Sequence, residues 1–332
     1  GPAAFSEVVN PMLAKQTQGL KQSCGIVLID FAGSADGRTL IDNLILSNQP
    51  KPVAMPLRFK EGKLKIAQLT DVHWTPGSEK SEKGNPETIL KVLDMEKPDV
   101  VILTGDVVTS KPAKEGWKHI VEMMETAGVP FAVTMGNHDA ENWSEDSIYN
   151  YLSKSRLFIG KKGPEALSGT GNYILPVYAS DGTDKINALL YCMDSNDYTA
   201  DAEKYGNYAW IDWGQIAWYR EQSRQYTTKN NGNPLPALAF FHIGVPEFKH
   251  LQNRPDMYGH LGEGGGFPKI NSGMFQSMIE MGDVMGVFVG HDHDNDYIAQ
   301  EYGIALGYGR VSGHDAYGDL ERGARIIELF ED

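Results

Sequence analysis

The sequence is poor in cysteine, has no long apolar run and shows no internal repeat. Its 332 residues include two cysteines, Cys24 and Cys192, each within an apolar stretch and in no metal-like spacing. We expect buried free thiols rather than a disulfide. No apolar stretch approaches the ~20 residues that span a bilayer, so no membrane span is expected. The absence of a fixed period excludes repeat architectures.

Positive charge is also scarce. Lys and Arg number 30 against 44 Asp and Glu, which gives a formal net charge of −14. A surface that binds polymeric nucleic acid needs a basic patch to neutralise phosphates. The densest basic stretches, Lys60–Lys65 and Lys161–Lys162, are short and are interpreted as solvated surface. We therefore expect a small diffusing substrate and no nucleic-acid polymer; the oligomeric state stays open.

The first 54 residues are the least interpretable part of the chain. They begin Gly-Pro-Ala-Ala, without Met, which indicates a removed signal peptide or an expression scar. Abundant Asn, Gly, Tyr and Trp with few Cys favour a periplasmic or secreted location, with a cytoplasmic one as the alternative. A helical stretch at Ser6–Gln18 and apolar stretches at Gly25–Phe31 and Thr39–Leu46 precede a proline-rich break. We predict an N-terminal extension, residues 1–54, that packs on a main domain, residues 55–332.

The main domain alternates strand and helix patterns. Its first strands are predicted at Lys63–Leu69, Asp99–Leu103 and Pro130–Thr134, with helical spacing between them at Pro86–Glu96 and Glu115–Ala127. This order indicates an α/β fold, which we expect to be two mixed β-sheets packed as a sandwich and flanked by helices. Further elements are predicted as helices at Glu145–Ser155 and Trp213–Gln225 and strands at Gly171–Val177, Asn187–Asp194, Ala237–Phe241, Val284–Val289, Ile304–Gly309 and Ala324–Phe330.

Five of these strands end at a residue type that binds metals. Ligands in open α/β sheets bind at the carboxyl ends of strands, so five strand ends can deliver side chains to one crevice. Any one of the five motifs alone is more often structural, but five in succession predict a metal site. The residues, in strand order, are Asp71 and His73; Asp106; Asn137, His138 and Asp139; His242; and His291 and His293.

The residue types and spacings suggest how such a site is built. Imidazole with carboxylate favours Mn, Zn or Fe over Ca or Mg. In an extended Asp-x-His segment the two side chains point the same way, so Asp71 and His73 can hold one ion. The glycines before Asp106, Asn137 and His291 are expected to permit tight turns out of the strands.

This ordered motif set resembles the calcineurin-like metallophosphoesterase superfamily over roughly residues 60–330. The resemblance implies a sandwich of two mixed sheets and two divalent transition-metal ions. It also implies hydrolysis of a phosphoester by metal-activated water, with His138 assisting the leaving group and Asp139 as its partner. The implied ligands of the first ion are Asp71, His73, Asp106 and His293, and those of the second are Asp106, Asn137, His242 and His291, with Asp106 bridging.

Four further segments are similar to the purple acid phosphatase-like proteins of plants and fungi. They are residues 169–173, 191–198, 240–248 and 290–297. Purple acid phosphatases proper have a tyrosine ligand three residues after the bridging aspartate, where this chain has Thr109. A purple Fe(III) centre is therefore not expected. The other ligands are complete, so we expect an active enzyme.

Substrate contacts are harder to infer from the sequence. The candidates are Asn196 and Tyr198, in an aromatic, amide-rich loop, and Arg310. The alternatives are that the loop residues pack on the domain and that Arg310 forms a surface salt bridge. The stretch Gly262–Gly266 lacks the Lys-Ser/Thr of a P-loop and is interpreted as a mobile loop. Two alternative functions stay open: a cyclic-nucleotide or other small phosphodiesterase on the same site, and a metal-binding regulatory protein without turnover.

Overall fold

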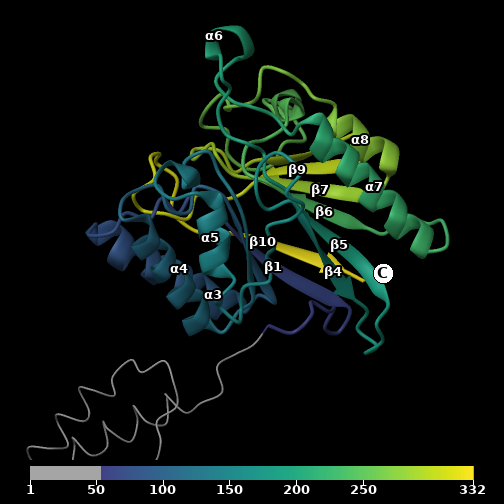
Figure 1. Ribbon diagram of the computed structural model, residues 1–332, viewed down its shortest axis with the longest axis horizontal. Coiled ribbons are helices and arrows are strands. Elements are labelled where there is room, and N and C mark those ends of the chain that lie inside the picture. The colour runs from purple at the N-terminus through teal and green to yellow at the C-terminus, as the bar shows by residue number, and fades with distance from the viewer. Residues whose placement is uncertain (1–53, 332) are drawn as a thin grey trace, which may run out of the picture. The chain divides into compact units, whose positions relative to one another are not determined.

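The computed structural model describes residues 54–331, and the elements predicted before residue 54 lie outside this part of the chain. Two mixed sheets form the centre of the domain (Figure 1). The four-stranded sheet has the order β10 (Arg325–Phe330), β1 (Lys63–Leu69), β2 (Val100–Thr104) and β3 (Phe131–Thr134). The six-stranded sheet has the order β4 (Tyr173–Tyr178), β5 (Ile186–Cys192), β6 (Ala237–Phe240), β7 (Val284–Val289), β9 (Ile304–Tyr308) and β8 (Ile298–Glu301).

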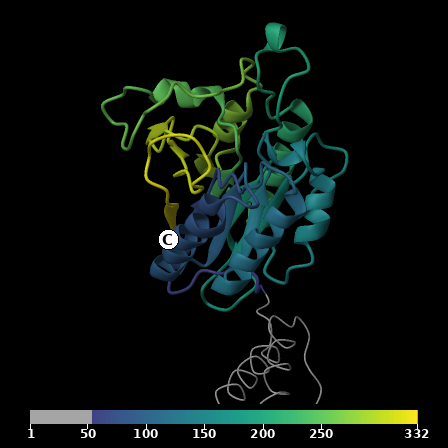
Figure 2. The same ribbon diagram turned by 90° about the vertical axis from the view of Figure 1, so that its left-hand side faces the viewer.

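The interior strands of both sheets are parallel, and the antiparallel strands lie at the edges. β1, β2 and β3 run parallel, as do β5, β6, β7 and β9, whereas β10, β4 and β8 pair antiparallel with their neighbours. The carboxyl ends of the parallel strands in each sheet therefore share one edge. The long green and yellow loops of the C-terminal half gather at the upper end of the strands in Figure 2.

Alternating side chains of the six-stranded sheet build two separate cores. Leu190, Phe240 and Phe288 pack in one cluster with the four-stranded sheet, whereas their neighbours Leu189 and Ala239 belong to a second cluster. The first core also holds side chains of α3 (Asn85–Glu96), α4 (Ala113–Ala127) and α5 (Glu145–Leu152), and the second those of α7 (Trp213–Lys229) and α8 (Met274–Met281). This period of two is the one expected of sandwiched sheets, and the predicted fold class is confirmed.

Several elements were not predicted from the sequence. α8 follows Gly273 without a side-chain cap, and the four-residue edge strand β8 joins β9 through Tyr302 and Gly303, both at positive φ. This hairpin turn lacks the usual Asn-Gly or Asp-Gly signal. The remaining short elements are the π-helix η1 (Lys80–Gly84), the 3-10 helices η2 (Asp139–Glu141) and η3 (Pro246–Leu251), and α6 (Ala202–Tyr205).

The structure also bears on the cysteines and on membrane spans. Cys192 is a buried free thiol, and burial raises its pKa to about 12. Cys24 lies outside the described residues. Within residues 54–331, no helix has the length and apolar character needed to cross a bilayer.

Candidate metal centre

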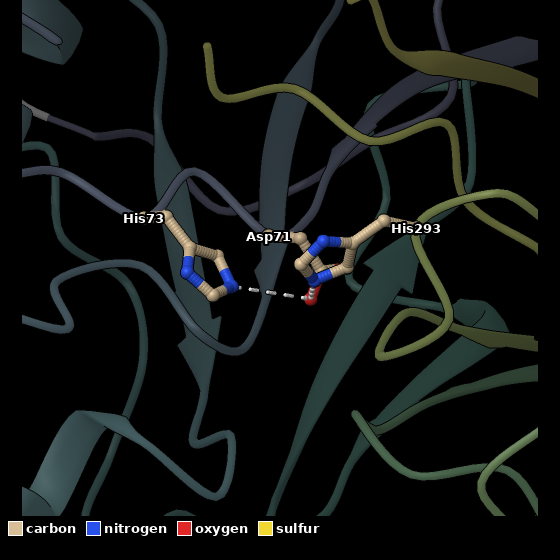
Figure 3. A group of neighbouring side chains, drawn as sticks. All are labelled: Asp71, His73 and His293. Atoms are coloured by element: carbon tan, nitrogen blue, oxygen red, sulfur yellow. Dashed lines mark ion pairs between the residues drawn. The ribbon is translucent and has the colours of Figure 1, made fainter. Parts of the chain in front are cut away.

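Six of the predicted ligands converge in two compact groups at the carboxyl ends of the parallel strands. Asp71, His73 and His293 form one group and Asp106, His242 and His291 the other, and the candidate ligand atoms within each group lie within 4.8 Å of one another. Figure 3 shows the first group, in which both imidazole rings are directed at the Asp71 carboxylate. Residues separated by more than 200 positions thus share one site, as the sequence predicts.

Asp106 lies between the two groups. Its Oδ2 is 3.3 Å from His242 Nε2 and 3.7 Å from His73 Nε2. Asp71 Oδ1 is 3.2 Å from His293 Nε2 and 4.0 Å from His73 Nε2. The proximity of Asp106 to a histidine of each group is what its predicted bridging role requires.

Several buried atoms at the centre have no hydrogen-bond partner among the described residues. They are Asp71 Oδ1, His73 Nε2, Asn137 Oδ1 and His242 Nε2. Buried polar atoms are normally satisfied, and these are the atom types that bind divalent transition metals. The donor set and its unpartnered atoms therefore fit the two predicted ions.

The other polar atoms of the same side chains are held in place by hydrogen bonds. Asp71 Oδ2 accepts from the Thr70 hydroxyl at 2.8 Å and from the His291 amide at 3.0 Å. His242 Nδ1 lies 2.8 Å from the Thr104 carbonyl, which can only accept, so Nδ1 donates and Nε2 faces the site. Such outer contacts orient ligands toward a metal.

The protonation states of the ligands suit cation binding. Burial opposes ionisation of Asp71 and Asp106, but attraction to His293 lowers the pKa of Asp71 to about 2, and His242 lowers that of Asp106 well below its usual range. Burial lowers the pKa of His73 to about 4 and that of His291 to about 3, so both rings are neutral. Although burial opposes it, Asp106 raises the pKa of His242 to about 10. Binding of a cation must displace that proton.

The backbone at the ligands is not extended, which corrects the expectation for the Asp-x-His segment. Asp71 and His73 lie beyond the end of β1 with φ of 52° and 47°, and Asp106 and His291 have φ of 50° and 78°. Left-handed φ is uncommon for residues other than glycine and clusters at functional sites. The side chains of Asp71 and His73 therefore converge through left-handed backbone at both residues and not through strand alternation.

The glycines before the ligands serve two different purposes. Gly105 has φ +85°, as a tight turn requires, but Gly136 and Gly290 do not have positive φ. A Cβ at Gly136 would overlap the Asp106 carboxylate, and one at Gly290 would overlap the Thr70 hydroxyl. The expected turn role is thus wrong for Gly136 and Gly290, where glycine instead permits close packing of the strand ends.

His138 faces a cavity of about 480 Å³ beside the metal ligands. Its Nδ1 is 2.7 Å from Glu141 Oε1, its Nε2 is 3.5 Å from the Tyr198 hydroxyl, and its backbone amide donates to Asp106 Oδ1 at 2.9 Å. The ring partner is therefore Glu141, three residues on along the 3-10 helix η2, and not Asp139 as the resemblance implied.

Asp139 has a structural role, since its carboxylate binds backbone amides. It is fully buried, and its carboxylate accepts from the backbone amides of Val107 at 2.9 Å, Val108 at 3.1 Å and Gly136 at 2.9 Å. Burial raises the pKa of Asp139 to about 7. Asp139 thus joins the loop that follows Asp106 to the loop that carries Asn137, and it holds those two ligands in position.

The three predicted substrate contacts have different surroundings. The Tyr198 hydroxyl accepts from Asn137 Nδ2 at 2.8 Å, which puts it at the site. The Asn196 amide instead donates to the Trp210 carbonyl and to Gln215 Oε1, each at 2.8 Å. Arg310 forms an ion pair with Asp296. The contacts of Asn196 and Arg310 are structural ones that stabilise loops.

Other residues around the cavity were not among the predicted site residues. Tyr317 stacks on His293 with ring centroids 3.8 Å apart, and Tyr208 meets His291 edge-on at 4.5 Å. Glu263–Gly266 line the cavity, and the Gly266 amide donates to Asp292 Oδ1 at 2.8 Å, which anchors the end of the stretch expected to be a mobile loop. These contacts join residues distant in sequence and have no local sequence signal.

The chain has relatives among known proteins. It matches the family described as calcineurin-like phosphoesterase over residues 64–295. It is 32% identical over 304 residues to the Arabidopsis thaliana protein named probable inactive purple acid phosphatase 29, and the aligned region covers 82% of this chain and 78% of that protein. Phosphatase DCR2 of Saccharomyces cerevisiae is 30% identical over 309 residues, covering 81% of this chain and 52% of that protein.

A solved structure shares the fold. A dimetal phosphatase from Danio rerio superposes with a TM-score of 0.56 over 81% of this chain and 93% of that chain. The sequence identity is 13%, so this similarity concerns the fold alone.

Proposed function

Because the chain belongs to the calcineurin-like phosphoesterase family, we propose that it is a dinuclear metal-dependent phosphohydrolase that cleaves a small phosphate ester. The observation that carries this proposal is the pair of buried ligand groups, with unpartnered Asp71 Oδ1 and His242 Nε2. Buried polar atoms without partners destabilise a fold, and bound metal ions would remove this cost.

The residues of the two groups would hold the ions. Asp71, His73 and His293 would bind the first and Asp106, His242 and His291 the second, with Asn137 Oδ1 as a further ligand. When bound, two divalent ions lower the pKa of water to near neutrality and offset the negative charge that develops on the phosphoryl oxygens.

The protein's own contribution to bond cleavage is His138. Glu141 Oε1, 2.7 Å from Nδ1, accepts a hydrogen bond from Nδ1–H, so the ring is oriented with Nε2 toward the cavity. When the ring is doubly protonated, the Nε2 proton can pass to the departing alkoxide oxygen and leave a neutral ring. The Tyr198 hydroxyl, 3.5 Å from Nε2, is near enough to hold the ring or the leaving group in place.

A regulatory protein without turnover is the competing function, since some relatives carry the name probable inactive. This chain keeps every predicted ligand together with Asn137 and His138, which supports turnover. Thr109 stands where a purple acid phosphatase has its tyrosine ligand. We therefore propose Mn, Zn or Fe(II) rather than an Fe(III)–tyrosinate pair.

Metal dependence tests the proposal. Purified chain stripped with a chelator is expected to hydrolyse neither 4-nitrophenyl phosphate nor bis(4-nitrophenyl) phosphate, and added Mn²⁺ or Zn²⁺ is expected to restore hydrolysis of at least one of them. Release of 4-nitrophenolate is the measurement, and chain dialysed in parallel without chelator is the control. A metal-loaded chain that hydrolyses no phosphoester would support the regulatory alternative.

A further inference from the structure

The cavity at the metal centre has an unusual charge for a phosphate-binding site. No lysine or arginine is among the described residues that line it, whereas Glu263 and Asp292 both are. Sites that bind the terminal oxygens of a phosphate commonly use arginine or lysine for this purpose. Among the described lining residues, histidine alone can carry positive charge, and any further positive charge would come from bound cations.

The arginines on the segment next to the cavity are occupied elsewhere. Arg322 donates to the backbone carbonyls of Ala316 and Tyr317 at 2.7 and 3.1 Å, and Arg310 is paired with Asp296. Arg325 donates to the carbonyls of Tyr308 and Asp296. These contacts hold the loop in its fold, and turning any of the three toward a substrate would leave carbonyl or carboxylate oxygens unpaired.

Glu263 is fixed in its position on the cavity wall. Its Oε1 accepts from the Asp294 amide at 2.9 Å, and its carboxylate accepts from the Tyr317 hydroxyl at 2.9 Å. Its backbone amide and carbonyl both bond the side chain of the fully buried Asn295, at 3.2 and 3.1 Å. Two donors thus hold the carboxylate and two hydrogen bonds hold the backbone of Glu263, which keeps its charge in place when an anion enters.

A fixed negative charge discriminates by the charge of the ligand. Its repulsion of a dianion is twice its repulsion of a monoanion at the same distance. A phosphomonoester is a dianion above its second pKa of about 6, whereas a phosphodiester carries one negative charge. The second ester group of a diester would meet the rings of Tyr208 and Tyr317, which line the same cavity.

We propose that the substrate is a small phosphodiester and that Glu263, held by Tyr317 and Asn295, disfavours phosphomonoesters. This inference rests on the proposed function and adds to it the charge class of the substrate. It assigns to Glu263 the role of a specificity-determining residue.

The test compares two esters of one leaving group at pH 8, with Mn²⁺-loaded full-length chain. The wild type is expected to have a kcat/KM for bis(4-nitrophenyl) phosphate at least about tenfold above that for 4-nitrophenyl phosphate. Glu263→Gln, which keeps the hydrogen-bond acceptor and removes the charge, is expected to raise kcat/KM about tenfold for the monoester and about threefold for the diester. The ratio of kcat/KM for the diester to kcat/KM for the monoester should then fall about threefold.

The matched control is Glu61→Gln. Glu61 is exposed in the turn before β1, at the opposite end of the strand from the metal ligands. Its substitution removes the same charge from the chain. This variant is expected to leave both kcat/KM values and their ratio unchanged. A wild type that prefers the monoester, or a ratio that Glu263→Gln does not shift, would overturn the inference while leaving the proposed function intact.

Binding separates a failure of this inference from a failure of the proposed function. Calorimetry on the Mn²⁺-loaded chain is expected to show that Glu263→Gln lowers the Kd for methyl phosphate about tenfold and that for dimethyl phosphate about threefold, independent of turnover. If neither nitrophenyl ester is hydrolysed, the proposed function fails, but these changes in Kd would still support charge selection by Glu263. Equal changes in the two Kd values would overturn it.

Discussion

Asp106→Asn is expected to lower kcat/KM for any phosphoester by at least ~10³ and to reduce the bound metal. Asparagine has nearly the same shape, but it removes the charge that lies 3.3 Å from His242 Nε2 and 3.7 Å from His73 Nε2. Loss of a residue that merely orients a ligand costs about 10–100-fold in affinity or activity. If Asp106 bridges the two ions, as predicted, loss of its charge should cost more.

The measurements for Asp106→Asn are metal content by elemental analysis after dialysis and kcat/KM on the better ester. Asp184→Asn is the matched control, because Asp184 is exposed in the β4–β5 hairpin, at the end of β5 opposite the metal centre. It should behave as wild type. An Asp106→Asn protein that kept two ions and activity within tenfold of wild type would remove Asp106 from the proposed bridging position.

His138→Ala is expected to keep the metal and to lose about 10²–10⁴ in kcat, the usual contribution of a general acid. The hydrogen bond from the His138 backbone amide to Asp106 Oδ1 remains in the variant, so the ligand shell keeps this contact. The loss should depend on the leaving group. An alkyl ester, whose alkoxide needs a proton, should lose more than a nitrophenyl ester.

The control for His138→Ala is His250→Ala, which removes a ring that is exposed and lies 3.4 Å from Glu301. Elemental analysis and single-turnover kinetics on the two kinds of ester are the measurements. Equal losses for alkyl and nitrophenyl esters would show that the ring does not protonate the leaving oxygen. Unchanged turnover would exclude His138 from the mechanism altogether.

Much of the fold could be predicted because strand patterns and strand-end residues are local signals. β1 and β7 coincide with the predicted strands, and α4 ends at Ala127, before Gly128 at φ 68°, as its glycine indicates. The edge strand β8 and the short helix α8 were not predicted, since both are brief and lack caps or standard turn residues. Residues 1–54 and the cellular location stay predictions.

The ligands of the site could be named from the sequence, but not the way in which they meet. Convergence of Asp71 and His73 depends on left-handed backbone, which the motif itself does not reveal. The partnership of His138 with Glu141 depends on the 3-10 helix η2, whereas the family resemblance implied Asp139. Glu263 and Tyr317 meet across 54 residues of chain, a contact set by tertiary packing alone.

The number of cations bound per chain tests the central claim most directly. Stripped wild-type protein titrated with Mn²⁺, followed by elemental analysis after removal of free metal, should retain two ions per chain, one for each group of buried ligands. Retention of none or one under saturating conditions would contradict a dinuclear centre.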